Sequence, residues 1–195
     1  ERAWPAVRSE SLLLHTIIVI DSTGRIVADL RPESLAVGMD VLNRAYFDVF
    51  AAGRVRDYDL ANPITGRQSG LWVLPLSVPV TRPDGSFAGA TVVGAGRDFF
   101  DTSSWNTVDP EARVYMHLRD GGALIAVTDP DARRDERAGL EAHFAATPAI
   151  EVGARLAPLE LPDTLGYRRD SASGRFQMVL LKDRSVLAAG ARRAG

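Results

Sequence analysis

Apolar residues run almost without interruption from residue 12 to residue 20, and a polar turn follows them. The turn is Asp21-Ser22-Thr23-Gly24, after which residues 25–30 resume an extended pattern. Two extended runs joined by turn residues are typical of a β-hairpin. The pattern therefore predicts a hairpin at the start of the first half.

A helix is predicted next, over residues 44–52. Asn43 has a side chain suited to capping its first turn, and Gly53 would end it. Tyr46, Phe47 and Phe50 recur at helical spacing, so one face of this helix is expected to meet a core.

Extended runs complete the first half. A short edge strand is expected at residues 58–62, and two long strands at residues 69–81 and 86–96 are joined by the turn Arg82-Pro83-Asp84-Gly85. Residues 98–110 would join this half to the next.

The second half repeats the order in shortened form. It has strands at residues 112–118 and 123–127, a helix at 136–146, a final strand pair around Ser173-Gly174, and a closing helix at 184–193 that Gly190 weakens. Residues 20–28 align without gaps on residues 118–126, with Gly24 on Gly122, and residues 84–87 align on 173–176. The match suggests a duplication and hence two similar sheets.

Composition changes the picture mainly by exclusion. Of 195 residues, 46% are hydrophobic and 25% charged, which is ordinary for a globular protein. The net charge of -2 and the lack of a basic block make nucleic acid an unexpected partner. There is no cysteine, so disulfides and thiolate nucleophiles are excluded, but the compartment is not fixed.

Catalytic and metal-binding patterns are not found either. His15, His117 and His143 are widely separated and form no ligand pair, and no P-loop or G-x-S-x-G elbow occurs. We therefore expect no catalytic residue, no metal and no cofactor. No apolar stretch approaches the roughly 20 residues that span a bilayer. Because the chain begins with Glu1 and has no leader, we expect it to be a piece of a longer protein.

Four runs in order resemble the double Cache (PDC) sensor domains of bacterial transmembrane receptors. They are IVIDSTGRIV at residues 18–27, GMDVLNRAYF at 38–47, SGLWVLPLS at 69–77 and PDGSFAGA at 83–90. The resemblance implies an α+β fold of tandem PAS-like modules, with two antiparallel sheets flanked by helices behind an N-terminal helix. The implied parts are the end of that helix (1–12), a membrane-distal, ligand-binding module (13–104), a membrane-proximal module (105–183) and a helix leading to a membrane span (184–195).

The resemblance also implies a function. It is the sensing of a small molecule in the periplasm, as the extracytoplasmic domain of an inner-membrane signalling protein that is a homodimer at full length. The four runs look most like the input domains of diguanylate cyclases. The input domain of a histidine kinase or a chemoreceptor is the alternative. A ligand-free dimerisation module and a secreted hydrolase are competing readings.

Arg44 is the first candidate for the ligand site. In amino-acid-binding relatives an arginine followed two positions later by an aromatic residue holds the ligand carboxylate, and Arg44 with Tyr46 matches that pattern. The acidic residue that would hold the amine falls near Ala95 or Gly96, so a simple carboxylate or another small anion is expected rather than an α-amino acid. Further expected contacts are Phe47, Tyr58, Asn62 and Trp72. A surface role for Arg44 and a core role for Trp72 are the alternatives. We expect only the first module to bind.

Overall fold

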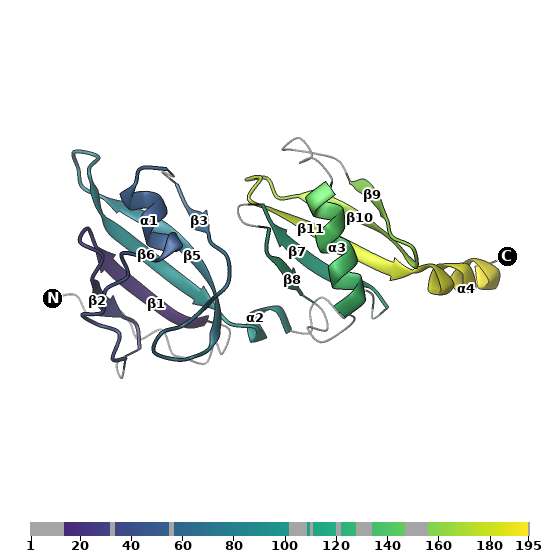
Figure 1. Cartoon of the computed structure of the whole chain (residues 1–195), viewed down its shortest axis with the longest axis horizontal. Coiled ribbons are helices and arrows are strands. Elements are labelled where there is room, and N and C mark those ends of the chain that lie inside the picture. Colours follow the sequence, from purple (N-terminus) through teal and green to yellow (C-terminus); the bar gives the residue numbers. More distant parts are fainter. Residues whose placement is uncertain are drawn as a thin grey trace. The chain divides into compact units, whose positions relative to one another are not determined.

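The computed structural model describes residues 14–31, 34–54, 57–101, 109, 111–119, 122–127, 134–146 and 156–194. The chain divides into two compact units, Glu1–Phe99 and Phe100–Gly195, each with its own antiparallel sheet (Figure 1). The predicted fold class is therefore confirmed. The N-terminal helix expected at residues 1–12 lies outside the described residues.

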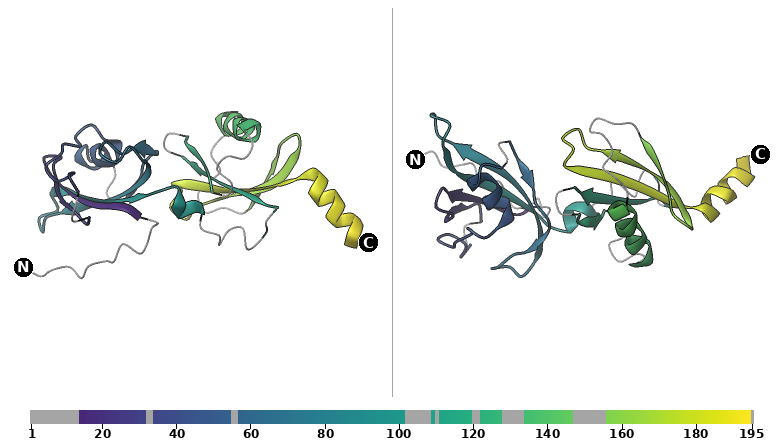
Figure 2. Two further views of the ribbon diagram at one scale, coloured as in Figure 1. Left: turned by 90° about the horizontal axis from the view of Figure 1, so that it is seen from below. Right: turned by 45° about the horizontal axis from the view of Figure 1, so that its top comes forward.

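The first sheet has the strand order β2-β1-β6-β5-β3, with β4 paired to β5. Its elements are β1 (Leu14–Asp21), β2 (Ile26–Asp29), α1 (Ala45–Ala51), β3 (Asp59–Leu60), β4 (Ile64–Thr65), β5 (Trp72–Thr81) and β6 (Phe87–Ala95). The helix α1 covers one face of this sheet (Figure 2). Alternate residues of β1 and β6, such as Ile20 and Ala90, are buried under that helix. Phe47 of α1 is fully buried and packs against Phe87 with ring centroids 5.6 Å apart.

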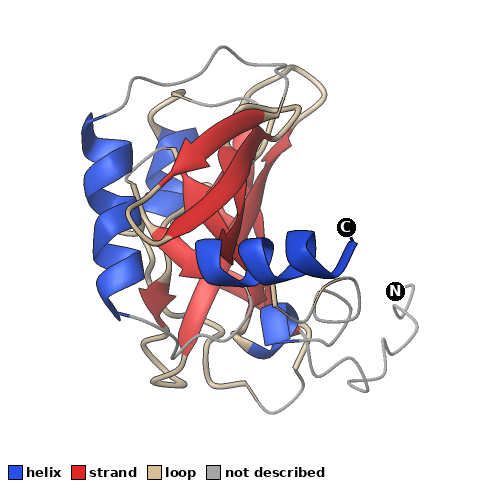
Figure 3. Ribbon diagram, turned by 90° about the vertical axis from the view of Figure 1, so that its right-hand side faces the viewer, coloured by secondary structure: helices blue, strands red, loops and turns tan. Residues whose placement is uncertain are grey.

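The second sheet has the order β8-β7-β11-β10-β9. Its elements are β7 (Arg113–Leu118), β8 (Leu124–Ala126), α3 (Arg134–Ala146), β9 (Ala157–Glu160), β10 (Thr164–Asp170) and β11 (Phe176–Asp183). The short helix α2 (Asp98–Asp101) precedes this sheet, and α4 (Arg184–Ala194) follows it. Figure 3 shows α3 running beside the strands. Its Leu140 packs with Tyr115, Val179 and Leu181 in the core of the second unit.

The two units share one topology. If the five main strands of each unit are numbered along the chain, both sheets have the order 2-1-5-4-3, and a helix follows the second strand in each. Gly24 and Gly122 both adopt left-handed φ values, 82° and 69°, as do Gly85 and Gly174 at 82° and 69°. The turn glycines therefore match as the sequence predicts.

The gapless alignment of residues 20–28 on 118–126 is wrong at the level of strand pairing. Ile20 pairs with Ala90, three residues after Phe87, whereas its aligned counterpart Leu118 pairs with Phe176, the counterpart of Phe87. The odd offset exchanges the faces of the strand. Ile20 lies on the α1 side, but Leu118 lies on the side opposite Tyr115, away from α3.

The predicted cap of the first helix is also wrong. Arg44 occupies the N-cap position with φ -98° and ψ 128°, and no side chain caps the helix. The side chain of Asn43 is engaged elsewhere, because its Oδ1 accepts a hydrogen bond from Arg67 Nη2 at 2.6 Å. Within the described residues, no helix combines the length and hydropathy that crossing a membrane requires.

Candidate functional site

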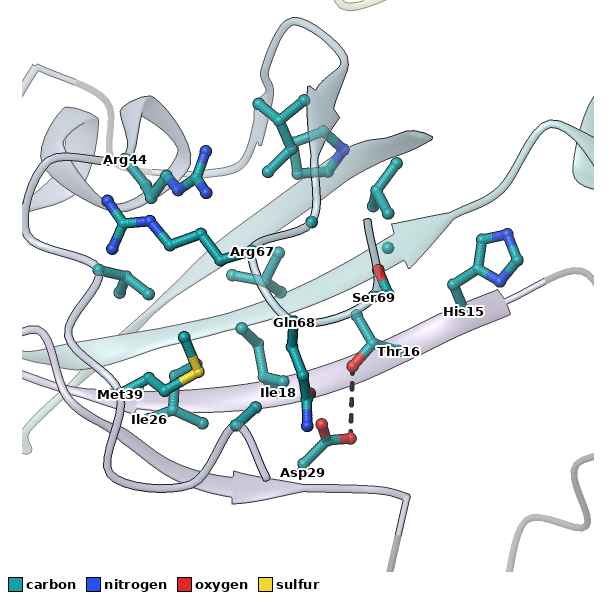
Figure 4. Close-up of a pocket in the computed structure, with 18 of the residues that line it drawn as sticks. His15, Thr16, Ile18, Ile26, Asp29, Met39, Arg44, Arg67, Gln68 and Ser69 are labelled. Carbon is teal, nitrogen blue, oxygen red and sulfur yellow. Dashed lines mark hydrogen bonds between the residues drawn. The ribbon is translucent and has the colours of Figure 1, made fainter. Parts of the chain in front are cut away.

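The first unit contains a cavity of about 100 Å³ on the α1-facing side of its sheet (Figure 4). This volume exceeds that of a single bound water several times over. Its floor is mainly apolar and comes from four strands, with Ile18 of β1, Ile26 of β2, Val92 of β6 and Val73 of β5. An apolar floor with a few polar groups around it is typical of small-molecule sites.

Gly94 on β6 keeps part of this floor open. It pairs with Thr16 on one side and Pro75 on the other. A Cβ atom there would lie 2.8 Å from Val73 Cγ1 and 2.9 Å from Thr16 Cγ2, closer than side chains normally approach. A side chain at position 94 would therefore intrude between two residues that line the cavity.

Arg44 and Arg67 place two guanidinium groups at one end of the cavity (Figure 4). Arg44 Nη2 donates one long hydrogen bond, 3.5 Å, to the carbonyl oxygen of Thr65, and no ion pair to it is found among the described residues. Most of its donors thus remain available. Arg67 Nη1 donates to the carbonyl oxygen of Asp40 at 2.9 Å, and together with its bond to Asn43 this fastens the β4–β5 turn to the segment before α1.

Tyr46 lies beside these two cations. Its side chain is buried, and burial raises the pKa of the Tyr46 hydroxyl, while the charges of Arg44 and Arg67 act in the opposite direction. The hydroxyl is therefore neutral at physiological pH and can donate or accept a hydrogen bond.

Asp29 places a carboxylate in the wall of the same cavity, at some remove from the two arginines (Figure 4). The side chain is completely buried, and its Oδ1 accepts from Thr16 Oγ1 at 3.3 Å and from the backbone N of Arg31 at 3.0 Å. Burial raises the pKa of Asp29, but hydrogen bonds from Ser34 and Arg31 outweigh it and hold the pKa below its usual value. The cavity wall thus contains a carboxylate, whose Oδ2 pairs with Arg31 Nη2 at 3.4 Å, as well as the two guanidinium groups.

Of the six residues predicted to contact a ligand, the structure brings Arg44 and Tyr46 to the cavity wall. Phe47 is a core residue. Trp72 lies under the guanidinium carbon of Arg97, 5.2 Å from the ring centroid. Tyr58 and Asn62 are not among the residues that line the cavity, although Asn62 Oδ1 is buried without a hydrogen-bond partner among the described residues.

Sequence reasoning missed several lining residues. They include His15, Asp29, Met39, Arg67, Gln68 and Ser69. Arg67 follows the Thr65-Gly66 turn, and Asp29 ends a short strand, so neither position carries a local pattern that distinguishes it from an ordinary surface residue.

A second cleft, of about 400 Å³, lies in the second unit at the start of α3. Its lining includes Asp135, Glu136 and Asp163. The Glu136 carboxylate is occupied by Arg113 and Tyr115, and the other two side chains are exposed. In the described part of the chain, no group of three or more His, Cys, Asp or Glu side chains could hold a metal ion.

No family model and no curated protein matches the sequence. Solved structures do match. The extracellular domain of the histidine kinase candidate rpHK1S-Z16 is 20% identical, with a TM-score of 0.70 over 95% of this chain and 77% of that one. The ligand-binding domain of the Pseudomonas fluorescens chemoreceptor CtaA with L-isoleucine is 13% identical, with a TM-score of 0.61 over 93% and 74%.

A third match is an extracellular ligand-binding receptor from Desulfohalobium retbaense. It is 18% identical with a TM-score of 0.61, and the alignment covers 90% of this chain and 31% of the receptor. The three are an extracellular domain, a ligand-binding domain and an extracellular ligand-binding receptor. Together with the two 2-1-5-4-3 sheets, they show that the chain has the tandem PAS-like fold of the double Cache sensor domains.

Proposed function

We propose that this chain is the extracytoplasmic, small-molecule-sensing part of a transmembrane signalling receptor, and that its first unit binds the ligand. The observation that carries the proposal is Arg44 in the cavity wall, with most of its guanidinium donors unused. A guanidinium offers a planar fork of donors that matches a carboxylate, so the ligand carries a carboxylate or a similar small anion. Recognition without chemistry is the role of the site.

Asp29 favours a second ligand class. The sequence gives no acid at Ala95 or Gly96, yet Asp29 shares a hydrogen bond with Thr16, which pairs with Gly94 in the sheet. Asp29, at the end of β2, therefore places a carboxylate near the end of β6, where the amino-acid-binding relatives carry their acidic residue. A ligand with both an anionic and a cationic group, such as an amino acid, would meet Arg44 with one and Asp29 with the other. The CtaA domain was solved with L-isoleucine, which supports testing this class.

Signalling would follow from differential affinity, because a ligand shifts a conformational equilibrium only if it binds one state more tightly. Residues 66–69 of the β4–β5 turn line the cavity, and Arg67 ties this turn to the start of α1. A ligand that competes for Arg67 would alter that tie. The output, whether diguanylate cyclase, histidine kinase or chemoreceptor, is carried by parts of the receptor beyond these residues.

The test is calorimetric titration of acetate, succinate, L-alanine and L-asparagine, with the tightest binder carried into variants. Arg44→Ala should weaken binding by about 10- to 150-fold, the equivalent of losing a charge-assisted hydrogen bond of roughly 1.5 to 3 kcal/mol. Arg44→Lys should recover little, because a point charge cannot reproduce the fork. Arg54→Ala is the matched control, since Arg54 is exposed, pairs with Asp48 and does not line the cavity.

Two outcomes would contradict the proposal. Unchanged affinity in Arg44→Ala would place the site elsewhere, and a large loss of stability of the unliganded Arg44→Ala protein would make Arg44 a structural residue. Asp29→Asn separates the ligand classes, because it should weaken amino-acid binding and leave succinate binding nearly unchanged.

A further inference from the structure

The second unit carries a row of polar side chains on the α3-facing side of its sheet. His117 on β7 pairs with Gln177 on β11, and Gln177 pairs with Asp170 on β10. His117 is two residues after Tyr115, and Gln177 is two residues before Val179. Tyr115 and Val179 pack with Leu140 of α3. Because strand residues two apart share a face, the row points toward the helix.

Each member of this row has a buried atom that lacks a hydrogen-bond partner among the described residues. The atoms are His117 Nδ1, Gln177 Oε1 and Asp170 Oδ1. The other carboxylate oxygen of Asp170 accepts from Arg119 Nη2 at 2.6 Å. Gln177 and Asp170 are only 3% and 8% exposed. Three groups able to accept a hydrogen bond thus lie on neighbouring strands, and none of these three atoms has a partner in the described part of the chain.

The His117 ring also forms a contact between this sheet and the end of α3. It stacks on Phe144 with centroids 4.0 Å apart and an interplanar angle of 5°. The neighbouring His143 meets the edge of the same phenyl ring at 5.7 Å and 79°. Any change that moves the His117 ring must therefore disturb the last turns of α3.

The charged groups that face His117 come from every described element packed around it. Arg119 follows it on the chain, Arg168 and Asp170 come from β10, and His143 comes from α3. The charge of Arg119 acts on His117 although Arg119 is paired with Asp170, and the charge of Arg168 acts on the neighbouring His143. Protonation of His117, which would add a further positive charge here, is disfavoured while the ring stays stacked on Phe144.

We propose that the second unit senses acid through His117, whose protonation releases the C-terminal half of α3 from the sheet. In the closed arrangement the neutral ring stacks on Phe144. In the released arrangement the ring turns out of the stack, and its Nδ1–H donates to Gln177 Oε1, the buried acceptor one strand away. The two arrangements form a bistable element that a single proton biases.

The direction of the pH dependence follows from linkage. Burial and the charge of Arg119 lower the pKa of His117 from the usual 6.5 in the closed arrangement. The released arrangement binds the proton more tightly, so closure is fully stable above about pH 6.5 and weakens as the pH falls below that value. Burial and the charge of Arg168 lower the pKa of His143 in the same sense. This function is independent of the ligand proposed for the first unit.

Hydrogen exchange of the whole chain, read by mass spectrometry at pH 7.5 and pH 5.5 and corrected for intrinsic rates, tests the proposal. Amides of α3 should lose protection at pH 5.5 by at most about tenfold, the limit that is reached when the proton binds only the released state. His117→Phe keeps an aromatic ring on Phe144 but cannot titrate, so its α3 protection should change with pH much less than that of the wild type, by no more than the smaller contribution of His143. His143→Gln, the comparison variant, should retain most of the effect.

The proposal is overturned if wild-type α3 protection is the same at both pH values, or if His117→Phe loses as much protection as the wild type. It is equally overturned if His143→Gln alone abolishes the effect. Where His117→Phe fails to fold, the NMR titration of the wild-type His117 Cε1–H resonance decides. A midpoint below 6.5 with a coupled shift of Phe144 is expected, and a midpoint at or above 6.5 contradicts the proposal.

Discussion

At the scale of single residues, Arg113 joins three elements of the second unit. Its guanidinium on β7 donates to Glu136 of α3 at 2.6 Å and to Asp183 of β11 at 2.8 Å, while Tyr115 donates to Glu136 at 2.6 Å. The hydrogen bond to Glu136 raises the pKa of Arg113 despite its burial. This hydrogen-bonded network contrasts with the His117 row on the same face of the sheet.

Glu136→Ala should destabilise the second unit by about 3 kcal/mol, the low end of the range for breaking a buried ion pair, because Asp183 still accepts from Arg113. The matched control is Glu141→Ala on the same helix. The Glu141 pair with Arg137 is about half exposed, so its loss should change stability by less than about 0.5 kcal/mol. Urea unfolding of the two variants checks the contrast, and equal losses would mean that the network adds nothing beyond a surface pair.

The residue scale also shows what sequence patterns can find. Arg44 and Tyr46 were identifiable because a short local spacing links them, and both line the cavity. Asp29 and Arg67 reach the same cavity from segments 15 residues before and 23 residues after Arg44. No motif or spacing near Asp29 or Arg67 in the sequence identifies either residue as part of a site. Only the paired strands bring them together, and the pairing register is not readable from one sequence.

At the scale of elements, glycine has opposite roles in the turns and the helices. Gly85 turns the β5–β6 hairpin with φ +82°, whereas Gly139 lies inside α3 with nothing within 4 Å of an added Cβ atom. The first glycine is required by its backbone conformation. The second only raises the conformational entropy of the unfolded chain.

Gly139→Ala should therefore stabilise the second unit by about 0.5–1 kcal/mol. Gly85→Ala should destabilise the first unit by about 1–2 kcal/mol, because it forces a side chain into the left-handed region. Denaturation midpoints measure both changes. A destabilised Gly139→Ala would show that another group occupies the space beside Gly139 and clashes with the added methyl group.

Elements with a strong hydrophobic periodicity were predictable from the sequence, whereas short elements without such a pattern were not. The strands at 69–81 and 86–96 and the helix at 136–146 correspond closely to β5, β6 and α3. The edge strand β9, with Pro158 at its second position, was missed because proline argues against a strand unless that strand lies at an edge. The two-residue strand β4 is defined only by its partner β5.

At the scale of the whole molecule, each sheet has its own core. Phe47 is fully buried in the first core, and Leu140 is fully buried in the second. No residue belongs to both clusters of the described side chains. We expect the two units to unfold as separate cooperative structures.

Phe47→Ala should destabilise the first unit by about 3–5 kcal/mol, and Leu140→Ala should destabilise the second by about 2–5 kcal/mol. Hydrogen exchange should report each loss only in the strands of the affected sheet, β1, β5 and β6 or β7, β10 and β11. Equal loss of protection across both sheets in either variant would show one cooperative structure instead of two.

The 2-1-5-4-3 strand order determines how each unit bears tension. Because the first and last strands are neighbours, Leu14 at the start of β1 lies opposite Ala95 at the end of β6, and Arg113 lies opposite Leu181 near the end of β11. If the chain is pulled at the two ends of a unit, the force therefore acts on one end of these antiparallel strand pairs. Their hydrogen bonds then break one after another. Such sheets yield to small forces, whereas strands pulled in shear resist until many bonds break together. The same neighbouring ends allow a whole unit to be inserted or removed without cutting its core.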